Sequence, residues 1–338
     1  MLLLGLLNTG NMTNARYQHT ASVLNNGTVL VNGGWNDSSP INSAELYDPS
    51  TGIWTTTGNM IDARSRHTAS ILSNGKILVT GGYNGGALIS VELYSPLTST
   101  WTTTGNMNVG RNDHTASILS NGKILVTGGW GGGFASFTST ELYDPSTGTW
   151  TVTGNMNVAR YQHTASILSN GTILVTGGFI NCCNGGALTS AELYDSSTNT
   201  WTITGNMNVA RGSHTASILS NEKILVTGGW SGNASLYSAE LYDPSTGTWT
   251  VTGNMNVARN NHKASILSSG NVLVTGGSNG SVALTSVELY DQLTETWTTP
   301  GNMNNARYFH TASVLNNGTV LISGGRNDIA SLNSAELY

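Results

Sequence analysis

The feature that most constrains the fold of this chain is a stretch that recurs seven times, as in residues 114–129, His-Thr-Ala-Ser-Ile-Leu-Ser-Asn-Gly-Lys-Ile-Leu-Val-Thr-Gly-Gly. Two short apolar runs flank Asn121-Gly122, and an Asn-Gly pair between β-prone runs is the strongest short-range indication of a hairpin. The pair predicts a type I′ turn, which needs φ > 0 at both central residues. Gly128-Gly129 then ends the second strand, since glycine has no Cβ to oppose a sharp exit.

Other residues recur in register with this hairpin. Three residues after each arginine comes a histidine, and seventeen residues after the arginine comes a Gly-Gly pair. A Glu-Leu-Tyr run and, in six of the units, a tryptophan come later. The arginines are Arg16, Arg64, Arg111, Arg160, Arg211, Arg259 and Arg307. Each unit of about 50 residues contains four short β-prone segments and no segment of helical period, which predicts one four-stranded blade of a propeller.

The spacing of Gly-Gly, Glu-Leu-Tyr and Trp resembles the kelch motif, and the resemblance covers almost the whole chain. It implies an all-β fold: one seven-bladed kelch-type β-propeller over residues 1–338, with four antiparallel strands in each blade.

The two ends of the sequence indicate how the ring closes. The seventh unit stops at Tyr338, in its third strand, and contains no tryptophan strand. At the start, residues 6–12 align with the tryptophan strand of the other units, with Leu6 in the place of tryptophan. Residues 3–9 are therefore predicted to form the outer strand of the last blade, which removes an open sheet edge.

The charge content is low and limits the classes of partner. Charged residues make up 9% of the chain and the net charge is −5. Without a basic patch we expect no binding of nucleic acid, and without an apolar run of ~20 residues we expect no membrane insertion. The uncharged polar composition favours a secreted or cell-surface protein. The sequence does not determine the oligomeric state.

The repeated Arg, His and Glu residues are interpreted as structural. Seven equal copies cannot form one asymmetric active site, whereas every blade needs the same internal contacts. Because unpaired arginines would repel one another and a buried unpaired charge is costly, each arginine is predicted to pair with a glutamate. No catalytic residue, metal ligand or cofactor is assigned.

Two enzyme classes are the alternatives that the resemblance raises. Galactose oxidase carries copper on a kelch propeller, with a site of two tyrosines, two histidines and a crosslinked cysteine; here every histidine belongs to the repeat. Ser-Thr-Gly-Thr-Trp resembles part of a sialidase Asp-box, which is itself a structural turn. The adjacent Cys182 and Cys183 fit no zinc or redox spacing. An exposed loop tip is the preferred interpretation, and a vicinal disulfide or soft-metal site is the alternative.

Variation between the copies points to a binding face. All length change falls between Gly-Gly and Glu, and substitutions concentrate between Arg and His. In a four-stranded antiparallel blade these two segments emerge on the same face, where loops on a rigid scaffold carry recognition. The candidate ligand-binding residues there are Tyr17, Trp35, Tyr83, Trp130, Phe134, Tyr161, Phe179, Trp230, Tyr308 and Phe309. The sequence thus predicts a non-catalytic scaffold for a protein or peptide, with a glycan as the second ligand class.

Overall fold

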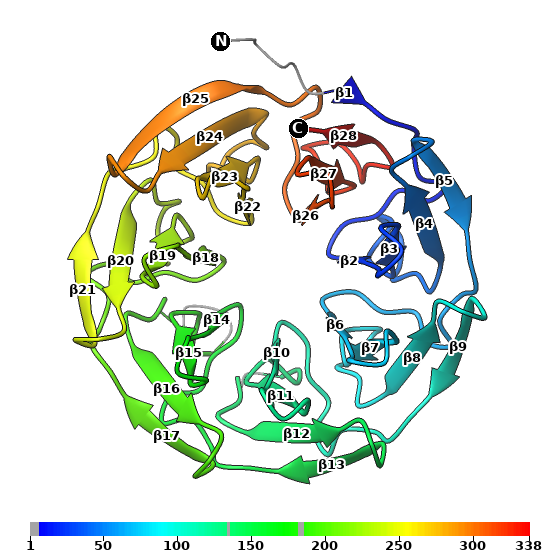
Figure 1. Ribbon diagram of the computed structural model, residues 1–338, viewed down its shortest axis with the longest axis horizontal. Helices are drawn as coiled ribbons and strands as arrows, with labels where there is room; N and C mark the ends of the chain where they lie inside the picture. The colour runs from blue at the N-terminus through cyan, green and yellow to red at the C-terminus, as the bar shows by residue number, and fades with distance from the viewer. Residues whose placement is uncertain (1–6, 134–135, 182–185) are drawn as a thin grey trace.

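The computed structural model describes residues 7–133, 136–181 and 186–338. These residues form 28 strands in seven four-stranded antiparallel sheets, with no helix among them. Figure 1 shows the sheets arranged as blades around a ring. The described part of the chain therefore offers no helix that could cross a membrane. The predicted seven-bladed all-β propeller is confirmed.

In blades 1 to 6 the four strands follow one another from the centre of the ring outward (Figure 1). Blades 1 to 3 consist of β2 (Thr20–Val23), β3 (Val29–Asn32), β4 (Ala44–Asp48) and β5 (Ile53–Thr56); β6 (Thr68–Ile71), β7 (Ile77–Thr80), β8 (Val91–Ser95) and β9 (Thr100–Thr103); β10 (Thr115–Ile118), β11 (Ile124–Thr127), β12 (Thr140–Asp144) and β13 (Thr149–Val152). Blades 4 to 6 consist of β14 (Thr164–Ile167), β15 (Ile173–Thr176), β16 (Ala191–Asp195) and β17 (Thr200–Ile203); β18 (Thr215–Ile218), β19 (Ile224–Thr227), β20 (Ala239–Asp243) and β21 (Thr248–Val251); β22 (Lys263–Ile266), β23 (Val272–Thr275), β24 (Ser286–Asp291) and β25 (Thr296–Asn302).

Blade 7 joins the two ends of the chain. It consists of β26 (Thr311–Val314), β27 (Val320–Ser323), β28 (Ala335–Leu337) and the N-terminal strand β1 (Leu7–Asn8). Leu7 pairs with Leu337 and Asn8 with Glu336 in an antiparallel register. Figure 1 shows β1 beside β28. The predicted closure by the N-terminal strand is therefore confirmed for residues 7–8. Thr9 lies beyond the end of β1, and residues 3–6 of the predicted strand lie outside the described residues.

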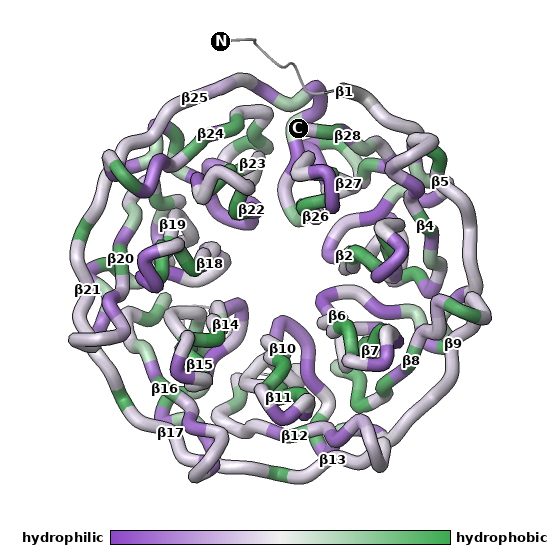
Figure 2. The backbone as a smooth tube through the Cα atoms, viewed as in Figure 1, coloured by the Kyte–Doolittle hydropathy of each residue, from purple (hydrophilic) through white to green (hydrophobic). Residues whose placement is uncertain are grey.

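The hydrophobic core lies between neighbouring blades. Leu78 and Met107 of one blade pack with Val126 and Tyr143 of the next, and the last blade packs on the first in the same way. Figure 2 shows the hydrophobic stretches on the strands within the blades. Trp150 lies against Tyr143, with ring centroids 5.1 Å apart. The repeated tyrosine and tryptophan are thus packing residues, as the equal copies predicted.

The hairpin turn differs from the predicted type I′ geometry. Gly122 N donates to Leu119 O at 2.9 Å, and Leu119 N donates to Lys123 O at 2.8 Å. Gly122 has φ of 81°, whereas Asn121 is not in the positive-φ region. The loop therefore contains three residues, a type I turn followed by one residue in the left-handed region. The prediction was wrong because Asn121 keeps a negative φ and its side chain instead accepts a hydrogen bond from Lys123 N at 3.0 Å.

Blade 5 has Glu222 where the other blades have this glycine. Glu222 adopts φ of 66°, which strains a side chain that has a Cβ. Ser169 Oγ of the preceding blade donates to the Glu222 carboxylate at 3.0 Å, on the exposed surface. The turn geometry is therefore kept in blade 5. The hydrogen bond to Ser169 is the only side-chain contact described for Glu222 that could offset the backbone strain, and it is exposed to solvent.

Candidate functional site

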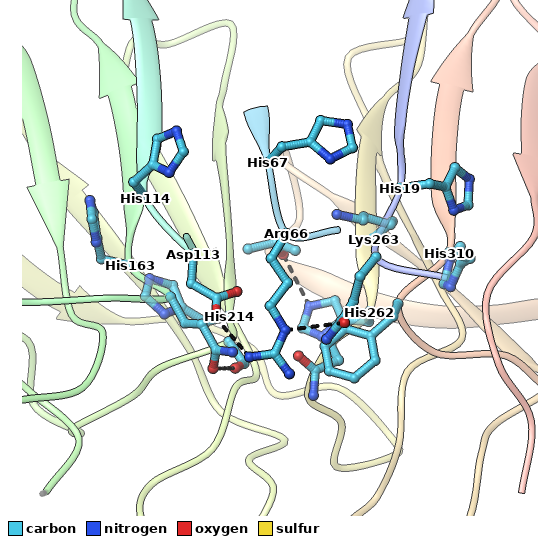
Figure 3. A pocket seen from close by; sticks show the side chains of 16 residues that line it. His19, Arg66, His67, Asp113, His114, His163, His214, His262, Lys263 and His310 are labelled. Carbon is cyan, nitrogen blue, oxygen red and sulfur yellow. Dashed lines mark hydrogen bonds and ion pairs between the residues drawn. The ribbon is translucent and has the colours of Figure 1, made fainter. Parts of the chain in front are cut away.

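A cavity of about 240 Å³ lies on the axis of the ring, and all seven histidines line it. Each histidine is buried and points its Nε2 at a hydroxyl or amide oxygen of the neighbouring blade; His114 Nε2 lies 3.0 Å from Thr68 Oγ1 and 3.1 Å from Thr80 Oγ1. Burial is the main cause that lowers the pKa of His114 to about 3, and the nearby Arg111 guanidinium adds to it. The imidazoles are therefore neutral at pH 7 and join adjacent blades. Figure 3 shows the seven histidines around the cavity.

Seven buried ion pairs fix the segments that lead to these histidines. Arg111 Nη2 lies 2.7 Å from Glu141 Oε1 within the same blade, and both side chains are at most 1% exposed. Arg111 Nη1 also donates to Gly128 O at 2.7 Å, and Glu141 accepts the backbone N–H of Asn108 at 2.7 Å. The other six pairs repeat this geometry. The predicted Arg–Glu pairing is confirmed, and it holds the incoming connection to the blade.

The residue before each histidine belongs to a ring around the channel. All seven have φ between 50° and 55°. The backbone N–H of each donates to the carbonyl of the corresponding residue in the preceding blade, and Gln18 N closes the circle by donating to Phe309 O at 3.0 Å. We call these residues the inner ring: Gln18, Arg66, Asp113, Gln162, Ser213, Asn261 and Phe309. They share nearly the same φ and the same backbone hydrogen bond, so their side chains are what distinguish one blade from another at the channel mouth.

Side chains of the inner ring form an asymmetric polar cluster. Arg66 Nε donates to Gln18 Oε1 at 3.1 Å, and Arg66 Nη1 lies 3.2 Å from Asp113 Oδ2 (Figure 3). On the other side, Ser213 Oγ donates to Gln162 Oε1 at 2.7 Å. Burial raises the pKa of the Asp113 carboxyl, and the Arg66 guanidinium opposes this rise. The channel mouth thus presents unequal hydrogen-bonding groups on an equal backbone.

The two variable segments meet, as the sequence predicted. The first residue after each repeat arginine forms an isolated β-bridge with the residue after Gly-Gly, as in Tyr17 with Trp35 and Tyr161 with Phe179. Gly81 shows why glycine is needed beside this contact: with φ of 59°, a Cβ on it would lie 2.5 Å from Arg111 O of the next blade. The loop face and the inner ring are therefore one continuous surface around the channel mouth.

Seven of the ten predicted aromatic residues line two hollows on this face. Trp35, Tyr83 and Trp130 line a hollow of about 260 Å³ with Tyr17 and two inner-ring residues. A second hollow, of about 380 Å³, is lined by several residues, among them Phe179, Trp230 and Tyr308.

The remaining predicted aromatic residues occupy different surroundings. Tyr161 lies between the rings of Trp130 and Phe179, at 6.4 and 5.6 Å. Phe309 stacks on Tyr17 at 6.3 Å. Phe179 is only 9% exposed, so its ring packs into the base of the loop. Phe134, Cys182 and Cys183 lie outside the described residues.

Sequence reasoning missed most of the inner ring and Lys263 on the channel wall. The sequence showed that the two residues between Arg and His vary from blade to blade. It did not show that the second of them, directly before the histidine, faces the channel while the first pairs with the residue after Gly-Gly. A simple signal marks Lys263: six blades have Thr after the histidine, and one has Lys.

The described residues do not fit a copper centre or another metal site. Within them no group of three His, Cys, Asp or Glu side chains could hold a metal ion. Each histidine Nε2 is already engaged with a neighbouring blade, as at His163, where Thr115 Oγ1 lies 2.9 Å away.

Comparisons with known proteins agree with this geometry. The KLHDC2/KLHL20/DRC7 Kelch-repeats domain matches residues 113–325, and the Kelch motif matches residues 15–61 and 64–108. A search among curated proteins returned no match. Among solved structures, the chain is similar to a fungal alcohol oxidase of the AA5 family in complex with copper, with TM-score 0.78 and 21% identity over 97% of this chain and 75% of the oxidase chain. At this identity the likeness supports the fold alone.

Proposed function

Since this chain belongs to the Kelch-repeat family, we propose that it is a non-catalytic binding scaffold that holds a protein or peptide partner on the loop face around its channel mouth. The proposal rests on one observation: both variable segments of every blade converge on that face, and their aromatic residues line two hollows. Clustered aromatic side chains in hollows are typical of the central anchors of protein interfaces. For this scaffold we propose a secreted or cell-surface setting, which only the composition supports.

The opposite face supplies a matched control. Thr147 lies in an exposed turn between the third and fourth strands of blade 3, the same blade that carries Trp130. Partners captured from a lysate of the source organism are identified by mass spectrometry and their affinities measured with purified proteins. We expect Trp130→Ala and Tyr308→Ala to weaken binding by about 2 kcal/mol or more, roughly thirtyfold. Thr147→Ala is expected to leave the affinity unchanged. An affinity that responds to Thr147 and ignores Trp130 and Tyr308 refutes the assignment of the face.

A glycan is the second candidate ligand. Trp35, Tyr83 and Trp130 line one hollow beside the polar Gln18 and Arg66, so apolar ring faces and hydrogen-bonding groups occur together there. A glycan array tests this candidate. A hit that is lost in Trp130→Ala and kept in Thr147→Ala supports it, whereas binding of every variant to the same sugars contradicts it.

A further inference from the structure

Lys263 breaks the symmetry of the channel wall. It is the first residue of β22 and lines the axial cavity together with the seven histidines. Figure 3 shows its side chain within the space that the histidines surround. The equivalent position is Thr in the other six blades. A neutral hydroxyl has therefore been replaced by an ammonium at one point of an otherwise repeated wall.

The replacement removes a framework contact. In blade 2 the equivalent Thr68 hydroxyl lies 3.0 Å from His114 Nε2 of the next blade. The corresponding histidine beside blade 6 is His310 of blade 7, which retains a contact at 2.9 Å with Thr275 Oγ1 alone. Lys263 thus stabilises the contact between neighbouring blades less than threonine does. We therefore look for its role in the channel and not in the framework.

The cavity carries one positive charge in excess. Its lining contains Arg66, Lys263 and a single carboxylate, Asp113, while the histidines are neutral at pH 7. Asp113 is paired with Arg66 at 3.2 Å. Within the described residues no carboxylate pairs with Lys263. Its side chain is exposed to the open channel, and partial desolvation by the surrounding channel walls lowers its pKa. The excess charge contrasts with the net charge of −5 of the whole chain.

We propose that the axial channel is a binding site for one oxyanion group, a phosphate or a carboxylate, held by the Lys263 ammonium. Lysine binds such groups as a point charge, and the exposed Lys263 side chain is accessible to an anion that enters the channel. The Asn261 amide lines the same cavity, and it donates one of its two N–H groups to Asn260 Oδ1, which leaves one further hydrogen-bond donor. With about 240 Å³ the cavity admits a small anion or one acidic side chain. The proposal rests on the channel wall and is independent of the partner proposed above.

The first arm of the test uses inorganic phosphate. Thermal unfolding is measured at pH 7.5 in sodium phosphate and in sodium chloride of equal ionic strength. At a phosphate concentration about tenfold above its Kd, we expect Tm to rise by about 2–3 °C. Lys263→Thr, which restores the residue of the other blades, and Lys263→Met are expected to lose this rise. Lys123→Thr, which removes a surface lysine that pairs with Asp144, is the matched control and should keep it.

The second arm distinguishes a free anion from a carboxylate carried by a peptide. Short capped peptides that differ only in one Glu or Gln are titrated by calorimetry against the wild type and Lys263→Met. Tighter binding of the Glu peptide that disappears in Lys263→Met assigns the site to an acidic side chain. A phosphate effect without a peptide effect assigns it to a free anion. The proposal is overturned if the wild type responds to neither probe, or if Lys263→Met responds as the wild type does.

Discussion

Acidification is expected to unfold this protein because seven histidines are buried in the neutral form. Their side chains are between 1% and 6% exposed. Burial lowers the pKa of His114 and of His214 to about 3 and shifts the other five in the same direction. In the unfolded chain each histidine titrates near 6.5. Between these values the unfolded state binds protons that the folded state does not.

The sign and size of the effect follow from proton linkage. Stability is fully present above the unfolded pKa and is lost as the pH falls below about 6.5, until the folded pKa is reached. From pH 7.5 to 5.5 each histidine removes about 1.4 kcal/mol of the free energy of unfolding, so seven remove about 9–10 kcal/mol. This loss is comparable with the whole stability of a typical domain, about 5–15 kcal/mol. The raised pKa of Asp113 acts in the opposite direction, but it is one group against seven.

Urea unfolding followed by tryptophan fluorescence at pH 7.5, 6.5 and 5.5 measures this loss. The pH slope should correspond to the uptake of about six protons on unfolding at pH 5.5. His163→Gln keeps an amide donor towards Thr115 and removes one titrating group, so its slope should be smaller by about one proton. A loss below about 3 kcal/mol in the wild type, or an unchanged slope in the variant, refutes the assignment of neutral buried imidazoles.

Three further changes test the framework. Arg111→Met leaves the Glu141 carboxylate buried without its partner and should lower the free energy of unfolding by about 3–5 kcal/mol in urea titrations; a loss below 1 kcal/mol contradicts the buried pair. Glu222→Gly relieves φ of 66° and should stabilise the protein by about 1 kcal/mol, while the reciprocal Gly122→Glu should destabilise it by a similar amount. Deletion of residues 3–9 removes the β1 pairing and should lower Tm clearly; an unchanged Tm argues against closure by this strand.

Much of the framework could be predicted from the sequence because each blade repeats the same requirement. Equal copies of Arg, Glu, Tyr and Trp predicted ion pairs and packing, and the absence of the last tryptophan strand predicted the closure. These inferences depend only on the number of copies of each residue and on their spacing in the sequence, so they do not require knowledge of the backbone conformation. The convergence of both variable segments on one face followed from strand alternation alone.

The turn type and the inner ring could not be predicted in this way. Asn-Gly is compatible with both a two-residue and a three-residue loop, and the choice depends on which carbonyl Gly122 N reaches. The inner ring has φ > 0 at residues such as Gln18 and Phe309, where local propensity argues against it. What holds these residues there is a backbone hydrogen bond from the neighbouring blade, and no single repeat contains that information.

The loops of blades 1 to 5 differ from those of blades 6 and 7, and this difference affects where a partner would bind. The residue after Gly-Gly is aromatic in blades 1 to 5 but is Ser278 in blade 6 and Arg326 in blade 7. Arg326 Nη1 lies 3.0 Å from Asp37 Oδ1 of blade 1 and its guanidinium covers the ring of Tyr17 at 5.5 Å from the centroid. Arg326 therefore joins the last blade to the first where the ring closes. An aromatic side chain at this position could not form the ion pair with Asp37. Since the aromatic residues after Gly-Gly are confined to blades 1 to 5 and blade 7 contributes Tyr308 from the other variable segment, we expect a partner to cover the loops of blades 1 to 5 and to contact blade 7 through Tyr308.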